Sequence, residues 1–154
     1  MAKAKPKLFT IGYEKAKPTA VLAELKRAKV KLLVDTRAVA ASRKPGFSKR
    51  QLAASLDEEG IGYLHLQKLG TPDAGRQAVR AGEFETMWRI YAKHLKTPEA
   101  IEAMAELVSI VKSGQTVCLL CFERDKNHCH RSRIAEVVHD RTGASVIDLA
   151  PELF

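Results

Sequence analysis

The chain has 154 residues, which points to one compact domain spanning residues 1–154, and its 45% apolar and 29% charged residues exclude an intrinsically disordered chain. No apolar run approaches the roughly 18 residues of a membrane span, and no secretory apolar segment follows Met1, so we expect a cytoplasmic protein with no membrane partner. Lys and Arg number 26 against 18 Asp and Glu, and the net charge of +8 is compatible with a polyanionic partner.

Short apolar runs alternate with segments of helical periodicity along the whole chain. The expected elements, in chain order, are a strand at 8–13, a helix at about 19–29, a strand at 31–35, a loop at 36–47, a helix that Ser48 opens and Gly60 ends, a strand at 61–66, a long Gly/Pro-bearing loop at 70–82, a helical stripe at 84–95, a helix from Thr97 to Gly114, a strand at 116–122, a helix at about 130–141 ended by Gly143, and a strand at 145–149. This alternation predicts a single-domain three-layer α/β/α fold with a mostly parallel, five-stranded, Rossmann-like sheet.

Local signals support two of these helices. Ser48 is followed three residues later by Gln51, a capping-box pattern, and Thr97-Pro98-Glu99 has the usual order of N-cap, first-turn proline and first-turn acid.

In a parallel sheet, ligands bind beyond the carboxyl ends of the strands. We therefore expect the site along that edge.

The segment after the fourth strand carries the densest set of reactive side chains. The strand ends at Cys121, a polar loop follows with Glu123, and the next helix begins near Cys129, His130 and Arg131. The backbone N–H groups of a helix N-terminus favour an anion and lower a thiol pKa, and Arg131 adds a fork suited to phosphate. Glu123 is a candidate general acid or base. The alternative is an internal polar network with inert cysteines.

Three cysteines in a cytoplasmic chain are expected to be reduced, so each is a core residue, a nucleophile or a ligand. Cys118 and Cys121 lie three apart on a strand and so point to opposite faces, which argues against a metal knuckle and makes Cys118 a buried apolar residue. A zinc site formed by Cys121, Cys129 and His130 or His128 is a weaker alternative, because no second CxxC or HxxxH pair supports these ligands. We expect no metal and no cofactor.

The positive charge is concentrated in residues 1–50, which hold 14 basic and 3 acidic residues, whereas the rest holds 12 basic and 15 acidic. Asp35 ends a buried strand and needs a partner, for which Arg37 is nearest. Arg43 and Lys44, with Phe47 beside them, suit a phosphodiester and a stacked base. The alternative is a solvated loop whose charge only keeps the protein in solution.

Several motifs, in the same order over nearly the whole chain, make it similar to domain-of-unknown-function family 488. They are Thr10-Ile-Gly-Tyr13, Val34-Asp-Thr-Arg37, Ser42-Arg-Lys-Pro-Gly-Phe-Ser48, Tyr63-Leu-His-Leu66 with Leu69-Gly70, and Leu120-Cys-Phe-Glu123 with Cys129-His-Arg-Ser132. The resemblance implies a small bacterial or archaeal cytosolic α/β protein and no known reaction. The chain departs from the family at Thr36, where valine is more frequent, and at Ala40, where proline is usual.

A more distant similarity in layout is to rhodanese-like domains, where an Asp-x-Arg follows an early strand and a strand-end cysteine leads to Arg-Ser at a helix. Here Cys121 and Arg131 are separated by a longer loop, and Glu123 and Asp125 would oppose a bound oxyanion. This analogy concerns the fold and is a weak guide to function.

Three functions follow as hypotheses. The first is binding or processing of a phosphate-bearing small molecule or nucleic acid, the second a cysteine-based sulfurtransferase or redox protein, and the third a non-enzymatic nucleic-acid-binding module. The expected catalytic residues are Glu123, Cys121, Cys129 and His130, and the expected ligand-binding residues are Tyr13, Asp35, Arg37, Ser42, Arg43, Lys44 and Arg131.

Overall fold

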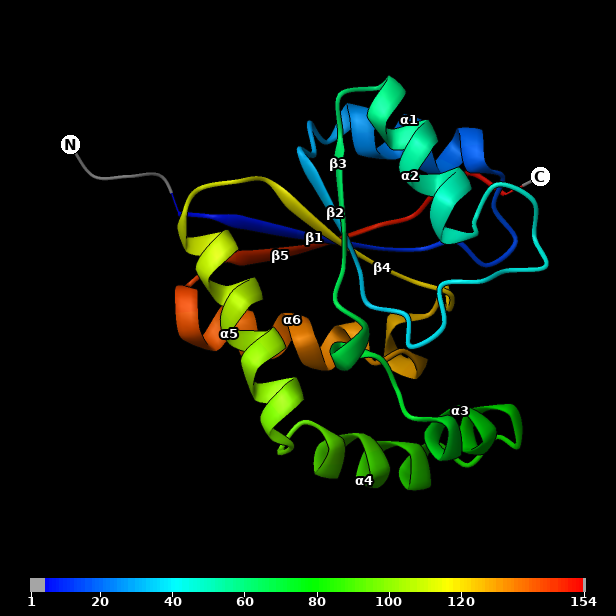
Figure 1. Cartoon of the computed structure of the whole chain (residues 1–154), viewed down its shortest axis with the longest axis vertical. Helices are drawn as coiled ribbons and strands as arrows, with labels where there is room; N and C mark the ends of the chain where they lie inside the picture. Colours follow the sequence, from blue (N-terminus) through cyan, green and yellow to red (C-terminus); the bar gives the residue numbers. More distant parts are fainter. Residues whose placement is uncertain (1–4, 154) are drawn as a thin grey trace.

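A computed structural model describes residues 5–153 of the chain and contains one five-stranded sheet (Figure 1). The strands are β1 (Lys7–Gly12), β2 (Leu32–Asp35), β3 (Gly62–His65), β4 (Val117–Cys121) and β5 (Ser145–Leu149). Their order is β3-β2-β4-β1-β5, and every neighbouring pair is parallel. The α/β prediction is confirmed, and the sheet is parallel throughout.

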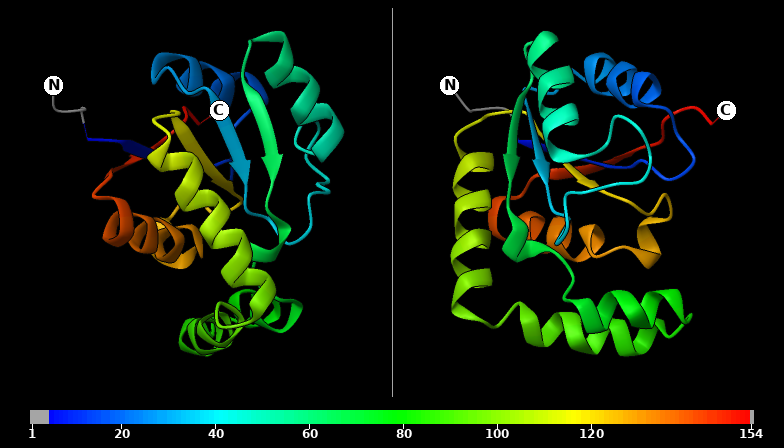
Figure 2. Two further views of the ribbon diagram at one scale, coloured as in Figure 1. Left: turned by 60° about the vertical axis from the view of Figure 1, so that its left-hand side comes forward. Right: turned by 45° about the vertical axis from the view of Figure 1, so that its right-hand side comes forward.

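The helices form a layer on each face of the sheet. They are α1 (Pro18–Arg27), α2 (Lys49–Glu58), α3 (Asp73–Arg80), α4 (Phe84–His94), α5 (Pro98–Lys112) and α6 (Arg131–Thr142), with two short 3₁₀ turns, η1 (Gln67–Leu69) and η2 (Lys126–His128). Helices α1 and α2 cover one face, and α5 and α6 cover the other (Figure 2). None of the helices in the described part of the chain has the length and apolar character needed to cross a bilayer.

Alternation along the buried strands divides the core into two clusters. On β4, Cys118 and Leu120 pack with α1 and α2, whereas Val117 and Leu119 pack with α5 and α6. Side chains of a strand alternate between faces, so Cys118 points away from the face that Cys121 shares with Leu119. Cys118 is fully buried, and burial raises the pKa of its thiol. Its predicted role as an apolar core residue is confirmed.

The predicted helix starts are only partly confirmed. The Thr97 hydroxyl accepts a hydrogen bond from the Ala100 N–H, as an N-cap does. The capping box at Ser48 and Gln51 is wrong. The Ser48 hydroxyl instead bonds Ser42 across the preceding loop, and the Gln51 side chain accepts from the Gly46 N–H. Both side chains stabilise the loop rather than the helix.

Helix α3 corrects the prediction of a loop over residues 70–82. Pro72 precedes its first turn and Asp73 lies in that turn, both of which suit a helix start. Gly75 is buried inside the helix, where a Cβ would lie 2.5 Å from the Thr71 side chain and 3.5 Å from Ile90 of α4. This glycine marks close packing between α3 and its neighbours, not a chain break.

The order of the strands places a crevice at the carboxyl ends of β1 and β4. The chain leaves β1 for α1 on one face and leaves β4 for α6 on the other, so the two connections diverge between these neighbours. Such a switch point is where open parallel sheets bind ligands. Gly12 permits a close approach here, because a Cβ at this position would lie 1.8 Å from the Glu123 carbonyl oxygen.

Candidate functional site

A cavity of about 390 Å³ opens at this crevice, and we call it the carboxyl-edge cavity. It is bounded by the loops after β1, β2 and β4 and by the pair α3–α4. Its lining consists of Glu14, Arg37, Ala38, Val39, Thr71, Arg76, Val79, Arg80, Met87, Phe122, Glu123, His128 and His130. The predicted convergence of strand ends on one edge is confirmed, and α3 supplies a wall that the sequence did not indicate.

Helices α3 and α4 lie beyond the carboxyl ends of β2 and β3, whose arrows point toward them in the left view of Figure 2. Phe84 at the start of α4 stacks on His128 of η2, with ring centroids 4.1 Å apart. Met87 and Tyr91, on the predicted stripe of α4, are buried. The stripe is therefore core, and it fixes the α3–α4 pair over the cavity.

Asp35 and Arg37 form a buried ion pair, as predicted. The Arg37 Nη2 lies 2.7 Å from Asp35 Oδ2, its Nε lies 2.9 Å from Oδ1, and Asp35 is fully buried. Tyr63 donates to the same carboxylate at 2.5 Å, and burial together with this bond raises the pKa of Tyr63. Burial acts to lower the pKa of Arg37, but Asp35 outweighs it and the pKa is raised. Both charges are satisfied within the protein.

The remaining Arg37 nitrogen, Nη1, ties the next loop to this pair. It donates to the Phe47 carbonyl at 2.7 Å and to the Tyr13 hydroxyl at 3.1 Å. Phe47 is fully buried and stacks on Tyr13, with centroids 4.3 Å apart. The prediction that Phe47 stacks a base is therefore wrong, because its ring is part of the core. Tyr13 is buried with it.

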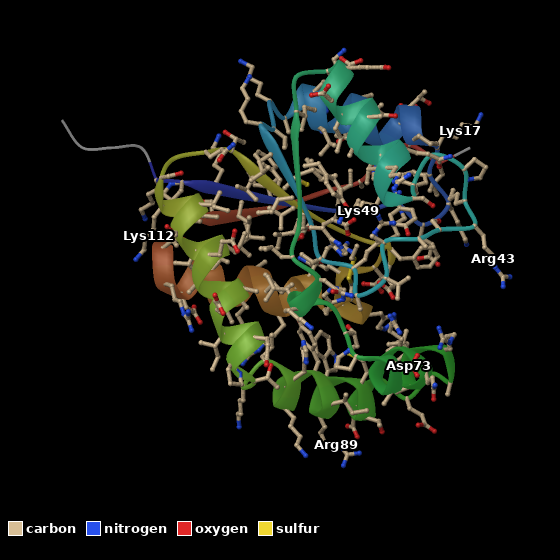
Figure 3. The ribbon with its side chains drawn as sticks, in the orientation of Figure 1. Lys17, Arg43, Lys49, Asp73, Arg89 and Lys112 are labelled. Atoms are coloured by element: carbon tan, nitrogen blue, oxygen red, sulfur yellow. A yellow bond between two sulfur atoms is a disulfide. The ribbon has the colours of Figure 1, made fainter. Side chains whose placement is uncertain are left out.

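The basic loop between β2 and α2 lies apart from the cavity, since Ser42, Arg43 and Lys44 are absent from its lining. Ser42 accepts from the Lys44 N–H, and the Lys44 ammonium lies 5.9 Å from the Phe47 ring centroid. Arg43 is exposed and projects outward (Figure 3). The ligand-binding roles of these three residues, and of Tyr13, Asp35 and Arg37, stay predictions.

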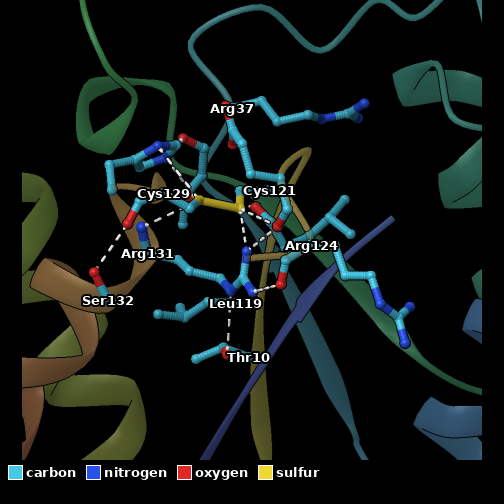
Figure 4. Close-up of a disulfide and its surroundings, with 12 residues drawn as sticks. Thr10, Arg37, Leu119, Cys121, Arg124, Cys129, Arg131 and Ser132 are labelled. Atoms are coloured by element: carbon cyan, nitrogen blue, oxygen red, sulfur yellow. Dashed lines mark hydrogen bonds between the residues drawn. A yellow bond between two sulfur atoms is a disulfide. The ribbon is translucent and has the colours of Figure 1, made fainter. Parts of the chain in front are cut away.

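Cys121 and Cys129 are joined by a disulfide (Figure 4), and their chain neighbours Phe122 and His130 line the cavity. The expectation of reduced thiols is thus wrong for this pair, because the loop after β4 turns back and brings the start of α6 against the strand end. Both residues are buried, with exposed fractions of 0% and 1%. Neither is a free, exposed thiol in this structure.

Arg131 holds the loop after β4 together from inside (Figure 4). It is 1% exposed. Its Nη1 lies 2.8 Å from Cys121 Sγ and also donates to the Glu123 carbonyl, its Nη2 donates to the Arg124 carbonyl at 2.9 Å, and its Nε reaches the Thr10 hydroxyl at 3.3 Å. Burial lowers the pKa of Arg131. Its fork, predicted to hold a ligand anion, is occupied by these partners here, and the ligand contact stays a prediction.

The start of α6 is likewise occupied by its own chain. The Arg131 N–H donates to Cys129 Sγ at 3.5 Å, and the Ser132 and Arg133 N–H groups donate to the carbonyls of Cys129 and His130. The expectation of an open anion site at this helix end is therefore wrong, since these donors already have acceptors.

Glu123 and His130 are the two predicted catalytic side chains that line the cavity. Burial raises the pKa of Glu123 above its ordinary value and lowers the pKa of His130 to about 4. The His130 Nε2 lies 2.8 Å from the Thr36 carbonyl oxygen and 3.1 Å from the Thr36 hydroxyl, which a valine would lack. The catalytic roles predicted for these residues and for both cysteines stay predictions.

Three charged residues of the cavity were missed by sequence reasoning. Arg76 and Arg80 lie four residues apart and so share one face of α3, and Glu14 follows β1. His128 on η2, named from the sequence only as an alternative zinc ligand, also lines the cavity. Recognising α3 as a helix would have placed the two arginines together. Glu14 had a positional signal, since it follows the strand end at Tyr13.

Comparison with known proteins gives one assignment. The family model described as "Domain of unknown function DUF488" matches residues 17–138. A search of curated proteins found no match. The similarity to rhodanese-like domains is not borne out.

Proposed function

The chain belongs to the family of domains of unknown function DUF488, and from that premise we propose that it binds a phosphate-bearing, nucleotide-sized ligand in the carboxyl-edge cavity. The observation that carries this proposal is the pairing of two arginines with exposed apolar side chains around one cavity. A cavity of about 390 Å³ is within the usual range for small-molecule sites.

Arg76 and Arg80 are the groups that we assign to the phosphate. Arginine presents planar N–H pairs that match phosphate oxygens. The Arg76 side chain is 32% exposed and pairs with Asp73, itself 67% exposed, at 3.1 Å. Exposed pairs of this kind contribute little stability, so a phosphate can take the place of Asp73 at low cost. Arg37, in contrast, is committed to the buried Asp35.

Val39 and Phe122 are the groups that we assign to the rest of the ligand. They are 54% and 46% exposed, and both line the cavity. Val79 and Met87 extend the apolar lining. A flat heterocycle laid against Phe122 would cover this surface while its phosphate lies at α3.

The test is isothermal titration of the full chain with adenosine and cytidine monophosphates, the corresponding nucleosides, and inorganic phosphate. We expect saturable binding of the monophosphates and a loss of at least about tenfold in affinity without the phosphate or in an Arg76→Gln, Arg80→Gln variant. Arg89→Gln is the matched control, because Arg89 projects from α4 away from the rest of the molecule (Figure 3). No saturable binding, or equal binding by both variants, would refute the proposal.

A labelled oligonucleotide distinguishes this function from the predicted nucleic-acid-binding module. Binding that weakens in Arg43→Gln, and not in the Arg76/Arg80 variant, would locate the partner at the basic loop between β2 and α2. Binding that depends on Arg80 would instead make a nucleic-acid end the ligand of the cavity. Titration at two salt concentrations separates phosphate contacts from other contributions.

A further inference from the structure

Cys121, Cys129 and Glu123 bring three metal-ligating atoms together at the carboxyl edge of the sheet, and Glu123 also lines the carboxyl-edge cavity. The two sulfur atoms and a Glu123 carboxylate oxygen all lie within 4.8 Å of one another. In the described part of the chain, no other three His, Cys, Asp or Glu side chains converge in this way. The proposed ligand function uses neither sulfur, so this cluster calls for an explanation of its own.

We propose that the reduced form of the Cys121–Cys129 pair, together with Glu123, binds one Zn²⁺ ion. Two thiolates and a carboxylate are a donor set that zinc accepts, whereas Mg²⁺ and Ca²⁺ prefer oxygen alone. The inference does not rest on the proposed function, since its readout is the metal itself.

We assign His130 as the fourth donor on zinc binding; in this structure its ring nitrogens lie outside the set of ligand atoms that fall within 4.8 Å of one another. Its Nε2 lies 2.8 Å from the Thr36 carbonyl oxygen, which only accepts hydrogen bonds, so Nε2 carries the ring hydrogen. The lone pair is then on Nδ1, which lies 3.9 Å from Cys129 Sγ. A histidine whose second nitrogen donates to a backbone carbonyl is the usual arrangement around a protein-bound metal.

Buried Arg131 matches the charge of such a site. Two thiolates and the Glu123 carboxylate carry three negative charges, which Zn²⁺ and the Arg131 guanidinium neutralise together. The guanidinium already lies 2.8 Å from Cys121 Sγ, and the Arg131 backbone N–H lies 3.5 Å from Cys129 Sγ. N–H donors to metal-bound sulfur stabilise and orient the ligands. No ion pair between Arg131 and a carboxylate is present among residues 5–153.

The backbone spacing is wide enough for an ion between the sulfurs. The Cα atoms of Cys121 and Cys129 lie 7.3 Å apart. Two sulfurs on one tetrahedral zinc, each at about 2.3 Å from the metal, lie about 3.8 Å apart. The Cα separation of 7.3 Å leaves room for the two sulfurs to move apart to this distance once the S–S bond is broken.

Zinc binding requires prior reduction of the disulfide. A phosphine reductant attacks one sulfur atom, and the S–S bond breaks to give a thiophosphonium and a thiolate. Water then converts the phosphonium to a phosphine oxide, and its two protons convert both cysteine sulfurs to thiols. Zn²⁺ then forms two Zn–S bonds and releases those two protons to solvent. The oxidised pair has no thiolate to offer, so metal binding and disulfide formation exclude each other.

The experiment titrates the full chain with Zn²⁺ after reduction by a phosphine, in competition with a chromophoric chelator. We expect one Zn²⁺ per chain in the reduced protein and none in the oxidised protein. Co²⁺ in place of Zn²⁺ should give a thiolate-to-cobalt charge-transfer band and the visible absorption of a tetrahedral site. Absence of stoichiometric metal in the reduced protein, or equal binding by the oxidised protein, would overturn the proposal.

Matched variants locate the site. A Cys121→Ser, Cys129→Ser variant should lose the metal, and Glu123→Gln should weaken binding by about tenfold or more while leaving the core cysteines in place. Cys118→Ala removes the third, buried thiol and should bind zinc as the parent does. If the double serine variant does not fold, Glu123→Gln and the cobalt spectrum provide the test. An unchanged Zn²⁺ affinity in Glu123→Gln would refute the proposed site.

Discussion

Two buried arginines hold the loops that follow β2 and β4, and their charges are balanced differently. Arg37 makes a bidentate pair with the fully buried Asp35. Arg131 is surrounded by carbonyls, a sulfur and a hydroxyl. The pKa of Arg37 is accordingly raised by its carboxylate, which outweighs burial, whereas burial lowers the pKa of Arg131.

The comparison distinguishes a loop whose buried arginine has a carboxylate counter-ion from a loop whose buried arginine contacts only neutral groups. The charge of Arg37 is neutralised by Asp35, so Arg37 needs no further anion as a counter-ion. The Arg131 network holds a cation in the interior with only neutral partners in contact, and a buried charge without a counter-ion is costly. Thiolates at Cys121 and Cys129 would provide that counter-charge.

The largest effect is expected from breaking the complete network. Asp35→Asn leaves Arg37 charged and buried without a counter-ion, and we expect a loss of about 3 kcal/mol or more in the free energy of unfolding. The measurement is urea denaturation followed by circular dichroism. Asp73→Asn is the control, because it breaks the exposed pair with Arg76 and should cost no more than about 1 kcal/mol. Similar losses in both variants would show that the buried Asp35–Arg37 pair stabilises the fold no more than the exposed Asp73–Arg76 pair.

A smaller effect is expected where the loop after β4 approaches β1. In Gly12→Ala, the new Cβ would lie 1.8 Å from the Glu123 carbonyl oxygen and 2.9 Å from Arg131 Nη1, so the loop has to move. We expect a loss of about 2–3 kcal/mol and, because Glu123 is displaced, weaker Zn²⁺ binding by the reduced protein.

Gly62→Ala provides the matched comparison for that variant. Its nearest neighbour is a methyl group of Leu32 at 3.1 Å, which can rotate away, so stability should change little. Equal stability of Gly12→Ala and the parent protein would show that the loop after β4 has no fixed position against β1.

The sequence predicted the sheet well because buried parallel strands read as short apolar runs. The runs around Leu33 and Leu119 were placed within a residue or two of their observed bounds. The pairing of Asp35 with Arg37 was also predictable, since a strand-end carboxylate in the core needs a cation, and Arg37 is the nearest one in sequence.

The walls of the site were harder to predict, for physical reasons. Gly75 suggested a loop, but it is required by close packing of α3 against Thr71 and Ile90, a tertiary contact that a single sequence does not display. The placement of Arg76 and Arg80 was lost with it. The Cys121–Cys129 contact depends on how the intervening loop turns, and residue spacing alone left a nucleophile, a ligand and a core residue all open.

The smallest expected effect concerns Asp148, whose carboxylate is linked to Arg131 through the Thr10 hydroxyl. The Thr10 hydroxyl donates to Asp148 and accepts from Arg131, and Lys126 also pairs with Asp148 at 3.0 Å. Burial acts to raise the pKa of Asp148, but the bonds from Thr10 and Lys126 outweigh it and hold the pKa below its ordinary value.

A carboxylate whose folded pKa is depressed stabilises the fold above its unfolded pKa, and that stabilisation is lost as the pH falls through the folded value. The stability difference between the parent and Asp148→Asn should therefore be present at pH 6 and shrink below about pH 4, which thermal unfolding across that range measures. The difference should be modest because the Asp148 side chain is 29% exposed and partly screened. A constant gap between the parent and Asp148→Asn across this range would mean that the ionisation of Asp148 contributes nothing to stability.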